Sequence, residues 1–332
     1  MSGSRVENGS ENGIENGNDW PCIVLAGPTA TGKTALAVEL AHVLGSEIFS
    51  MDSRQVYRGL DLGTGKDLYE YQRFGSPVPF HLIDIVEPSE VYSLFRFQED
   101  AYLALEDFRR RRGTAVPPIL VGGTGLYLEA VLKKYDIAHV PEDSALREEL
   151  TERDLEALKT ELKRLAPDLY ERTDVTTKRR VVRALEIALQ AARTTTGEVP
   201  RSHLPKWNLK PLLFVTQWDR PLLRQRIADR LQARLKDGLV DEVRRLHEQG
   251  LPWERLESLG MEYRQVALHV RGEKTLEAMS ADLLHEIHQL AKRQDTWFRG
   301  LERRGLKTHF IDPEITAVDL LNFYRSWQSG AG

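Results

Sequence analysis

The segment Gly27–Thr34 constrains the fold of this chain more than any other, because it matches the pattern G-x-x-x-x-G-K-[ST] at every fixed position. It follows the apolar run Cys22–Ala26, which is typical of a buried parallel strand, and precedes Thr34–Leu44, where apolar residues recur at helical spacing. In this context, backbone amides and the amino end of a helix bind a phosphate group. The pattern therefore predicts a phosphate or diphosphate site, a P-loop, formed by Gly27, Pro28, Thr29, Ala30, Thr31, Gly32, Lys33 and Thr34.

Two side chains of this loop have chemical roles of their own. Lys33 supplies a mobile cation for the phosphate, and the Thr34 hydroxyl can ligate Mg²⁺, so Mg²⁺ is the expected cofactor. The pattern does not identify the phosphate ester that binds. ATP or GTP is the default ligand, which makes a kinase or NTPase the default class.

Further apolar runs and helical segments alternate along the chain after the P-loop. Glu47–Met51, His81–Val86 and Pro118–Val121 are expected strands, Ser93–Arg112 is an expected helix, and Leu212–Val215 is an expected later strand. Strands that alternate with helices form a parallel sheet flanked by helices. The sequence therefore predicts the α/β class.

The pattern becomes almost wholly helical and charged between residues 129 and 203. Helices are expected at Ala145–Leu165 and Thr177–Ala192, and a loop is expected at Thr194–Gly197. We interpret this part as an all-helical insertion domain within the α/β core.

The rest of the chain divides into the core and two tails. The core comprises residues 20–128 and 204–312, with amphipathic helices from Pro221 to Arg304. Residues 1–19 are rich in Asn, Gly, Glu and Ser, so we expect a disordered tail there. Residues 313–332 are expected to be a C-terminal tail.

The charge of the chain is unevenly distributed. The 332 residues contain 46 Lys and Arg and 50 Asp and Glu, a formal net charge of −4 that by itself argues weakly against nucleic-acid binding. Residues 171–310, however, contain 27 basic and 19 acidic residues, whereas the rest of the chain is acidic. This basic part is a candidate surface for a polyanion, although solvated Arg-rich helix faces are equally consistent with the composition.

The composition also limits the compartment and the metal chemistry. Cys22 is the single cysteine, so the chain forms no intramolecular disulfide and no cysteine-based zinc cluster, and we expect Cys22 to be a small buried residue. No stretch approaches the roughly 20 apolar residues that span a bilayer, and the N-terminus lacks the apolar segment of a signal peptide. We expect a cytoplasmic protein that does not associate with membranes.

A carboxylate, Asp52, follows the second expected strand directly. Ligands of open α/β sheets bind beyond the carboxyl ends of the strands, so Asp52 should face the P-loop. There it could bind Mg²⁺ through water, accept a proton from a nucleophile, or cap the following helix. A second Gly-rich turn with a cation, Gly63–Asp67, is a weaker signal for a ligand.

Several short blocks occur in a characteristic order from about Pro21 to Arg299, which is most of the chain. They are Gly27–Thr34, Asp52-Ser53, Gln55–Tyr57, Gly63-Thr64 with Lys66, His81–Ile85, Val121–Tyr127, Arg179–Glu186, Asp219-Arg220, Arg226, Arg230, Ala291–Gln294, Trp297 and Arg299. In order and spacing these blocks resemble those of the tRNA dimethylallyltransferase family. The sequence has no zinc-finger extension, and in this it resembles the bacterial members of the family.

The resemblance implies a P-loop NTPase-like or kinase-like core in which the P-loop has a different use. The loop would hold the diphosphate of dimethylallyl diphosphate, with Mg²⁺. The enzyme would transfer the dimethylallyl group to N6 of the adenosine 3′-adjacent to the anticodon and release diphosphate. The counterpart of Asp52 takes the proton from that amine, and the counterpart of Thr124 contacts the flipped base. The helical insertion would grip the anticodon stem-loop of tRNA, and we expect a monomer.

Arginines on two segments are candidates for binding phosphate groups. Arg226 and Arg230 are four residues apart and share a helix face, with Arg220 upstream, so all three are candidate diphosphate ligands. We favour Arg230, which with Lys33 would stabilise the charge on the departing diphosphate. A solvated arginine face is the simpler alternative for any one of them. The resemblance places tRNA contacts at Asp52, Ser53, Arg54, Gln55, Thr124, Arg147, Arg179, Arg180, Val181, Val182, Arg183, Tyr263 and Arg264.

Three other functions remain open from the sequence. An adenylate isopentenyltransferase, which acts on free AMP, ADP or ATP, shares the P-loop and the aspartate, but the helical insertion favours tRNA. A P-loop small-molecule kinase would transfer phosphate from ATP. An RNA-binding module with a vestigial P-loop is the third alternative, but the intact Lys33, Thr34 and Asp52 argue against it.

The sequence departs from the family pattern in two segments. The segment Leu259–Gln265 is longer than usual, and Gly65-Lys66-Asp67 replaces Ala-Lys-Pro.

Overall fold

The computed structural model describes residues 19–193 and 201–330, and the chain forms two compact units. The core unit comprises residues 1–134 and 205–332, and the helical unit comprises residues 135–204. We expected the helical insertion at 129–203, but residues 125–132 form a helix of the core unit, so the helical unit begins later. The expected disordered tail lies outside the described residues except for Asp19, the first residue of a strand.

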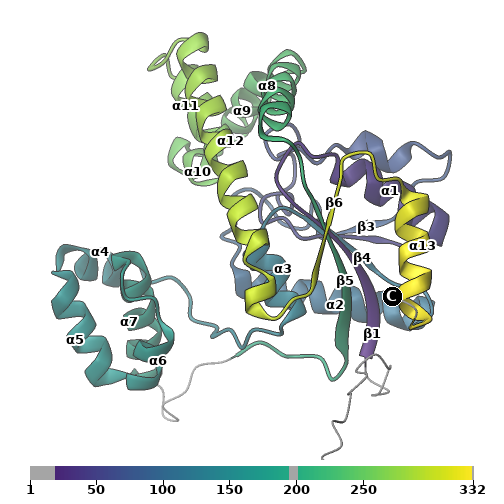
Figure 1. Cartoon of the computed structure of the whole chain (residues 1–332). Helices are drawn as coiled ribbons and strands as arrows, with labels where there is room; N and C mark the ends of the chain where they lie inside the picture. The colour runs from purple at the N-terminus through teal and green to yellow at the C-terminus, as the bar shows by residue number, and fades with distance from the viewer. Residues whose placement is uncertain (1–18, 194–200, 331–332) are drawn as a thin grey trace, which may run out of the picture. The chain divides into compact units, whose positions relative to one another are not determined.

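A six-stranded parallel sheet forms the centre of the core unit (Figure 1). Its strands are β1 (Asp19–Ala26), β2 (Ile48–Ser50), β3 (Phe80–His81), β4 (Ile119–Gly122), β5 (Asn208–Thr216) and β6 (Thr308–Ile311). They lie in the order β3-β2-β4-β1-β5-β6, and every pair is parallel. This arrangement confirms the predicted α/β class.

Two edge strands differ from the prediction. The third strand is only the two residues of β3, because Leu82 and Asp84 have positive φ angles of 65° and 56° that turn the chain away from extended backbone. The run expected to continue to Val86 makes an isolated bridge with Tyr57. At the other edge, β6 is a four-residue strand that the sequence analysis did not predict.

Helices of the core unit cover both faces of the sheet (Figure 1). They are α1 (Lys33–Leu44), α2 (Leu94–Arg112), α3 (Gly125–Leu132), α8 (Arg220–Lys236), α9 (Leu239–Glu248), α10 (Trp253–Ser258), α11 (Met261–Val270), α12 (Leu276–Arg299) and α13 (Ala317–Gln328), with short 3₁₀ helices at Leu68–Gln72 and Glu302–Arg304. Along β1, Cys22 and Val24 belong to the hydrophobic core that includes α2, α3 and α12, whereas Ile23 and Leu25 belong to the core that includes α1 and α13. Cys22 is fully buried, as predicted.

The segment expected to be a C-terminal tail contains the helix α13 instead. The Thr316 hydroxyl accepts a hydrogen bond from the Asp319 N–H at 3.2 Å, and the Asp319 carboxylate accepts one from the Thr316 N–H at 3.0 Å, which forms a capping box. Leu320 and Tyr324, four residues apart, are buried against the sheet and α1. This spacing of apolar residues is typical of an amphipathic helix and is visible in the sequence.

In its described part, the helical unit consists of four helices around its own hydrophobic core. They are α4 (Ser144–Glu152), α5 (Leu155–Leu165), α6 (Pro167–Arg172) and α7 (Lys178–Arg193). The helix expected over residues 145–165 is two helices, because the Asp154 carboxylate accepts hydrogen bonds from the N–H groups of Glu156 and Ala157 and starts α5. The expected loop at residues 194–197 lies outside the described residues. No helix in the described ranges combines the length and apolar character needed to cross a bilayer.

Arg304 should contribute strongly to the stability of the core unit. Its Nε donates to both carboxylate oxygens of Glu129, at 3.1 and 2.9 Å, and Glu129 is fully buried. We expect Arg304→Met to lower the free energy of unfolding by about 1–3 kcal/mol, because the buried carboxylate loses its main partner. Arg303→Met, at the exposed neighbouring position, is the matched control. Urea unfolding measures both variants, and equal stabilities would contradict the prediction.

Candidate active site

The P-loop joins β1 to α1 and turns tightly at the carboxyl edge of the sheet. Gly32 has a φ of 83° and Gly27 a φ of 140°, both in the region that favours glycine. A Cβ added at Gly27 would lie 2.2 Å from Thr216 Oγ1. That hydroxyl donates to Thr31 Oγ1 at 2.9 Å, and Thr31 in turn donates to the Pro28 carbonyl at 2.9 Å. The end of β5 therefore supports the conformation of the loop.

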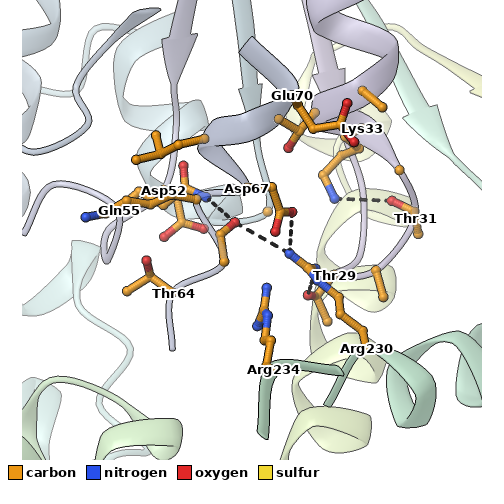
Figure 2. A pocket seen from close by; sticks show the side chains of 18 of the residues that line it. Thr29, Thr31, Lys33, Asp52, Gln55, Thr64, Asp67, Glu70, Arg230 and Arg234 are labelled. Atoms are coloured by element: carbon orange, nitrogen blue, oxygen red, sulfur yellow. Dashed lines mark hydrogen bonds and ion pairs between the residues drawn. The ribbon is translucent and has the colours of Figure 1, made fainter. Parts of the chain in front are cut away.

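A cavity of about 830 Å³ opens beside the P-loop (Figure 2). Its lining comes from the P-loop, from Asp52 after β2, from a turn within residues 61–71, from Gly122-Gly123 at the end of β4, and from α8 and α12. Asp52 and Lys33 line the same cavity, as expected because Asp52 and the P-loop each follow a strand of the parallel sheet.

Asp52 begins the turn that follows β2. Its Oδ1 accepts a hydrogen bond from the Arg54 N–H at 2.8 Å, so Asp52 caps this turn and also faces the cavity. Burial raises the pKa of Asp52, and the backbone hydrogen bond opposes the rise. Thr124 Oγ1 accepts a hydrogen bond at 3.4 Å from the N–H of Ser53, the residue after Asp52, but Thr124 is not part of the cavity lining. A carboxylate whose pKa is raised is a stronger proton acceptor than an ordinary one.

Lys33 bends back onto its own loop. Its Nζ donates to the Pro28 carbonyl and to Thr31 Oγ1, the latter at 3.2 Å. Burial and the nearby Arg230 lower the pKa of Lys33 to about 7, and Asp52 opposes this change. An anion beside this amine would stabilise its protonated form, so the surroundings of Lys33 favour an anionic ligand.

Two of the three candidate arginines of α8 reach the cavity. Arg226 donates from Nε to the Ala30 carbonyl at 2.9 Å, and Arg230 donates to Asp67 at 2.7 Å. Arg220 is exposed at the first position of α8 and is not part of the cavity lining.

Arg234 and Gln294 are cavity residues that were not among the predicted site residues. Arg234 follows Arg230 by one helical turn, a spacing that is visible in the sequence. Gln294 accepts a hydrogen bond from the Thr29 N–H at 2.9 Å and donates to the Gly123 carbonyl at 2.9 Å, so it joins the P-loop to the segment after β4. Nothing in the local sequence around Gln294 indicates this contact, because it depends on the packing of α12.

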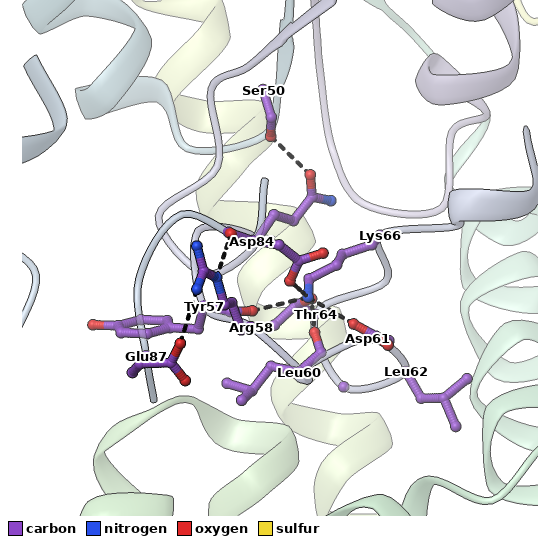
Figure 3. Close-up of polar contacts among 12 residues, drawn as sticks. Ser50, Tyr57, Arg58, Leu60, Asp61, Leu62, Thr64, Lys66, Asp84 and Glu87 are labelled. Carbon is purple, nitrogen blue, oxygen red and sulfur yellow. Dashed lines mark hydrogen bonds and ion pairs between the residues drawn. The ribbon is translucent and has the colours of Figure 1, made fainter. Parts of the chain in front are cut away.

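Lys66, the cation of the second Gly-rich turn, has a structural role (Figure 3). Its Nζ is enclosed and donates to the Tyr57 carbonyl at 2.8 Å, to Asp61 at 2.6 Å and to Asp84. A buried ammonium is tolerated when its three donors all have acceptors. These contacts hold the turn that borders the cavity.

The predicted tRNA contacts of the core unit occupy different environments. Tyr263 is 1% exposed, and its hydroxyl donates to Glu242 at 2.8 Å, so it is part of the core rather than of a surface. Arg54 and Arg264 are exposed. Gln55 lines the cavity.

The predicted tRNA contacts of the helical unit also differ in exposure. Val181 and Val182 lie in the hydrophobic core of the unit, so they support α7 from within instead of lying on its surface. Arg147 and Arg183 both pair with the carboxylate of Glu186, which is 1% exposed. The predicted contacts that are exposed are Arg179 and Arg180.

A P-loop in a parallel sheet, with a carboxylate facing it across a cavity, is the arrangement of a P-loop α/β enzyme. A family model described as IPP transferase matches residues 55–301, and one described as isopentenyl transferase matches residues 22–72. The chain belongs to the IPP transferase family.

Proteins similar to this chain are named as tRNA dimethylallyltransferases or tRNA isopentenylpyrophosphate transferases. A tRNA dimethylallyltransferase 1 of Syntrophus aciditrophicus (strain SB) is 47% identical over 290 residues, which cover 87% of this chain and 93% of that protein. A tRNA dimethylallyltransferase 1 of Geotalea uraniireducens (strain Rf4) is 47% identical over 303 residues, 90% of this chain and 96% of that protein. The crystal structure of the full-length tRNA isopentenylpyrophosphate transferase of Bacillus halodurans has a TM-score of 0.66 and 30% identity, covering 94% of this chain and 97% of that one.

Gly27→Ala should destabilise the core unit, because the added methyl group would overlap Thr216 Oγ1. We expect a loss of about 1–3 kcal/mol in the free energy of unfolding. Gly250→Ala is the matched control, since Gly250 also has a positive φ, of 100°, but has open space where its Cβ would lie. Denaturant titration compares the two, and a loss for Gly27→Ala no larger than that for Gly250→Ala would show the steric interpretation to be wrong.

Proposed function

We propose that this protein transfers the dimethylallyl group of dimethylallyl diphosphate to N6 of the adenosine 3′-adjacent to the anticodon in tRNA and releases diphosphate. One observation carries the proposal: a single cavity presents a desolvated carboxylate, Asp52, opposite a phosphate cradle that contains Lys33 and Arg230. Family membership adds the class of reaction, since the relatives are named for it.

The acceptor side of the reaction requires a base. The exocyclic amine of adenine is a poor nucleophile because its lone pair is delocalised into the ring. As the new C–N bond forms, the amine becomes acidic, and Asp52 accepts its proton. Thr124 is hydrogen-bonded to Ser53, the residue after Asp52, and would contact the same base.

The donor side requires stabilisation of a leaving group. The C–O bond between the dimethylallyl carbon and the diphosphate breaks, and its electron pair remains on the diphosphate. The P-loop amides, Lys33 and Arg230 are positioned to stabilise this added charge. A kinase would use the same cradle to hold a phosphoryl donor, so the identity of the donor separates the two functions.

Mg²⁺ is the proposed metal of this cavity. The ion prefers oxygen ligands and keeps several bound waters, so it needs few protein ligands. The hydroxyl of Thr34 lines the cavity and would be such a ligand. When bound, Mg²⁺ would neutralise part of the negative charge of the diphosphate.

The helical unit is proposed to bind the anticodon stem-loop. Arg179 and Arg180 are exposed on α7 and are available to contact phosphate groups. The target base must leave its stack before the amine can reach Asp52, at a cost of a few kcal/mol that contacts with the surrounding RNA must offset. Free AMP has no stack to leave and would not need a separate helical unit, so the presence of this unit favours tRNA over a mononucleotide as the acceptor.

The direct test is mass spectrometry of an anticodon stem-loop incubated with the protein, Mg²⁺ and dimethylallyl diphosphate. The proposal predicts a mass increase of one dimethylallyl group on the adenosine. Parallel reactions contain free AMP in place of the RNA, or ATP in place of the prenyl donor. Prenylated AMP with an unmodified stem-loop would identify an adenylate isopentenyltransferase, and phosphate transfer from ATP would identify a kinase.

Asp52→Asn should reduce the rate of the chemical step by about 10²–10⁴-fold, as is typical for loss of a general base. Because burial raises the pKa of Asp52, the activity of the unmodified protein should fall as the pH drops through that raised pKa, and the variant should lack this dependence. Single-turnover kinetics across pH measure both effects. Asp241→Asn, at an exposed carboxylate on α9, is the control, and tRNA affinity should be retained. An unchanged rate would exclude Asp52 as the base.

Arg179→Ala should weaken tRNA binding and reduce its salt dependence. Loss of one phosphate contact lowers the slope of log K against log salt by about 0.7–0.9. Arg179 is a better test than Arg183, because Arg183→Ala would also remove a partner of the buried Glu186. Fluorescence titrations of a labelled stem-loop at several salt concentrations provide the slope, with thermal unfolding as the control for fold. An identical slope would remove Arg179 from the phosphate contacts.

A further inference from the structure

Arg234 is the feature of the cavity that the reaction described above does not use. It lies on α8, one turn after Arg230, and both side chains line the cavity (Figure 2). The Nη2 atom of Arg234 is enclosed and has no hydrogen-bond partner among residues 19–193 and 201–330. The nearest carboxylate of the turn, Asp67, is already bonded to Arg230 at 2.7 Å.

This arrangement is unfavourable for the free protein. An enclosed N–H group without an acceptor loses its hydrogen bonds to water and gains none in return. Burial and the neighbouring Arg230 lower the pKa of Arg234 to about 10, so the side chain is still a cation at neutral pH, while Asp67 and Glu262 oppose this change. Two guanidinium groups one helical turn apart repel each other unless an anion lies between or beside them.

Gly65 shows that the turn beside the cavity is shaped around these guanidinium groups. Its φ is +63°, and a Cβ added there would lie 1.6 Å from Nη2 of Arg234 and 2.5 Å from Nη2 of Arg230. Any other residue at this position would have to displace the Arg234 side chain. The close approach of the Gly65 backbone therefore depends on the absence of a side chain there.

We propose that Arg234 is a further diphosphate-binding residue, which together with Arg230 binds the diphosphate of the donor and the released product, and that Gly65 provides the space for it. The identity of the donor rests on the proposed function, whereas the existence of an anion site rests only on the geometry of the cavity. Burying a cation at a cost to the free protein is reasonable where a ligand of opposite charge completes its contacts.

Arg234→Met distinguishes a diphosphate-binding role of Arg234 from a purely structural role, because the two roles predict different changes in diphosphate affinity and in melting temperature. If Arg234 binds diphosphate, the variant should bind inorganic diphosphate with Mg²⁺ at least about tenfold more weakly, as expected for the loss of one charge-assisted hydrogen bond. Its melting temperature without ligand should be equal to or higher than that of the unmodified protein, because an unsatisfied buried cation has been removed. If Arg234 only supports the turn, the melting temperature should fall and the affinity for diphosphate should not change.

Isothermal titration with inorganic diphosphate and thermal unfolding make these measurements on the full chain. Arg224→Met, at an exposed position of the same helix, is the matched control, and Arg234→Lys should recover part of the affinity. The KM for dimethylallyl diphosphate should rise with the loss of affinity, whereas the KM for tRNA should not change. Unchanged diphosphate affinity in Arg234→Met would overturn the inference.

A double-mutant cycle tests the part assigned to Gly65. Gly65→Ala should weaken diphosphate binding when Arg234 is present, because the new methyl group displaces the guanidinium. The same change should have a smaller effect in the Arg234→Met background, where that group is gone. Equal effects in both backgrounds would contradict the assignment. If the unmodified protein binds diphosphate through Arg234 but transfers no prenyl group, the proposed function fails and the anion site stands.

Discussion

The parallel pairing of β1 with β4, and of β4 with β2, is the constraint on which the site depends. In a parallel sheet the carboxyl ends of the strands lie at one edge, so the P-loop, Asp52 and Thr124 meet although about 100 residues separate the first from the last. The register pairs Ala26 with Gly122 and Ser50 with Val121, which brings the three strand ends level. The strand ends that precede the P-loop, Asp52 and Thr124 are therefore fixed relative to one another by backbone hydrogen bonds.

The electrostatics of the cavity follow from taking charged groups out of water. Burial raises the pKa of Asp52 and lowers that of Lys33 to about 7, so each is destabilised in its charged form before a ligand binds. An enclosed Arg234 adds to this cost. For Lys33 and Arg234, a bound anion would restore this stability, because it favours the charged form of both side chains. The arrangement suits a diphosphate that must be bound, activated and released.

The sequence predicted those features that depend on local pattern, and it missed those that depend on packing. The P-loop, Asp52 and the α/β class follow from short motifs and from alternation of strands and helices. Gln294 belongs to a block that resembles the family, but its contacts with the P-loop could not be predicted from local pattern, because they arise only when α12 packs against Thr29 and Gly123. Tyr263 differs in the opposite way: the family resemblance implied an RNA contact there, but the structure encloses the side chain. The exposure of a side chain depends on how the helices pack in the assembled fold. The spacing of apolar residues in a short helix such as α11 therefore predicts it poorly.

The enclosed position of Tyr263 has a physical explanation that connects distant helices to the cavity. Glu242, on α9, is 2% exposed and accepts hydrogen bonds from the N–H groups of Asp61, Leu62 and Gly63 at 3.0, 2.8 and 3.1 Å, as well as from the Tyr263 hydroxyl. A buried carboxylate needs several donors, and three successive backbone amides provide them only if the turn keeps one conformation. Gly63 also leaves room for the Tyr263 ring, which a Cβ would approach to 2.5 Å. The turn that carries Gly65 and Asp67 is thus fixed by α9 and α11, so Glu242 and Tyr263 hold the geometry of the proposed anion site although neither lines the cavity.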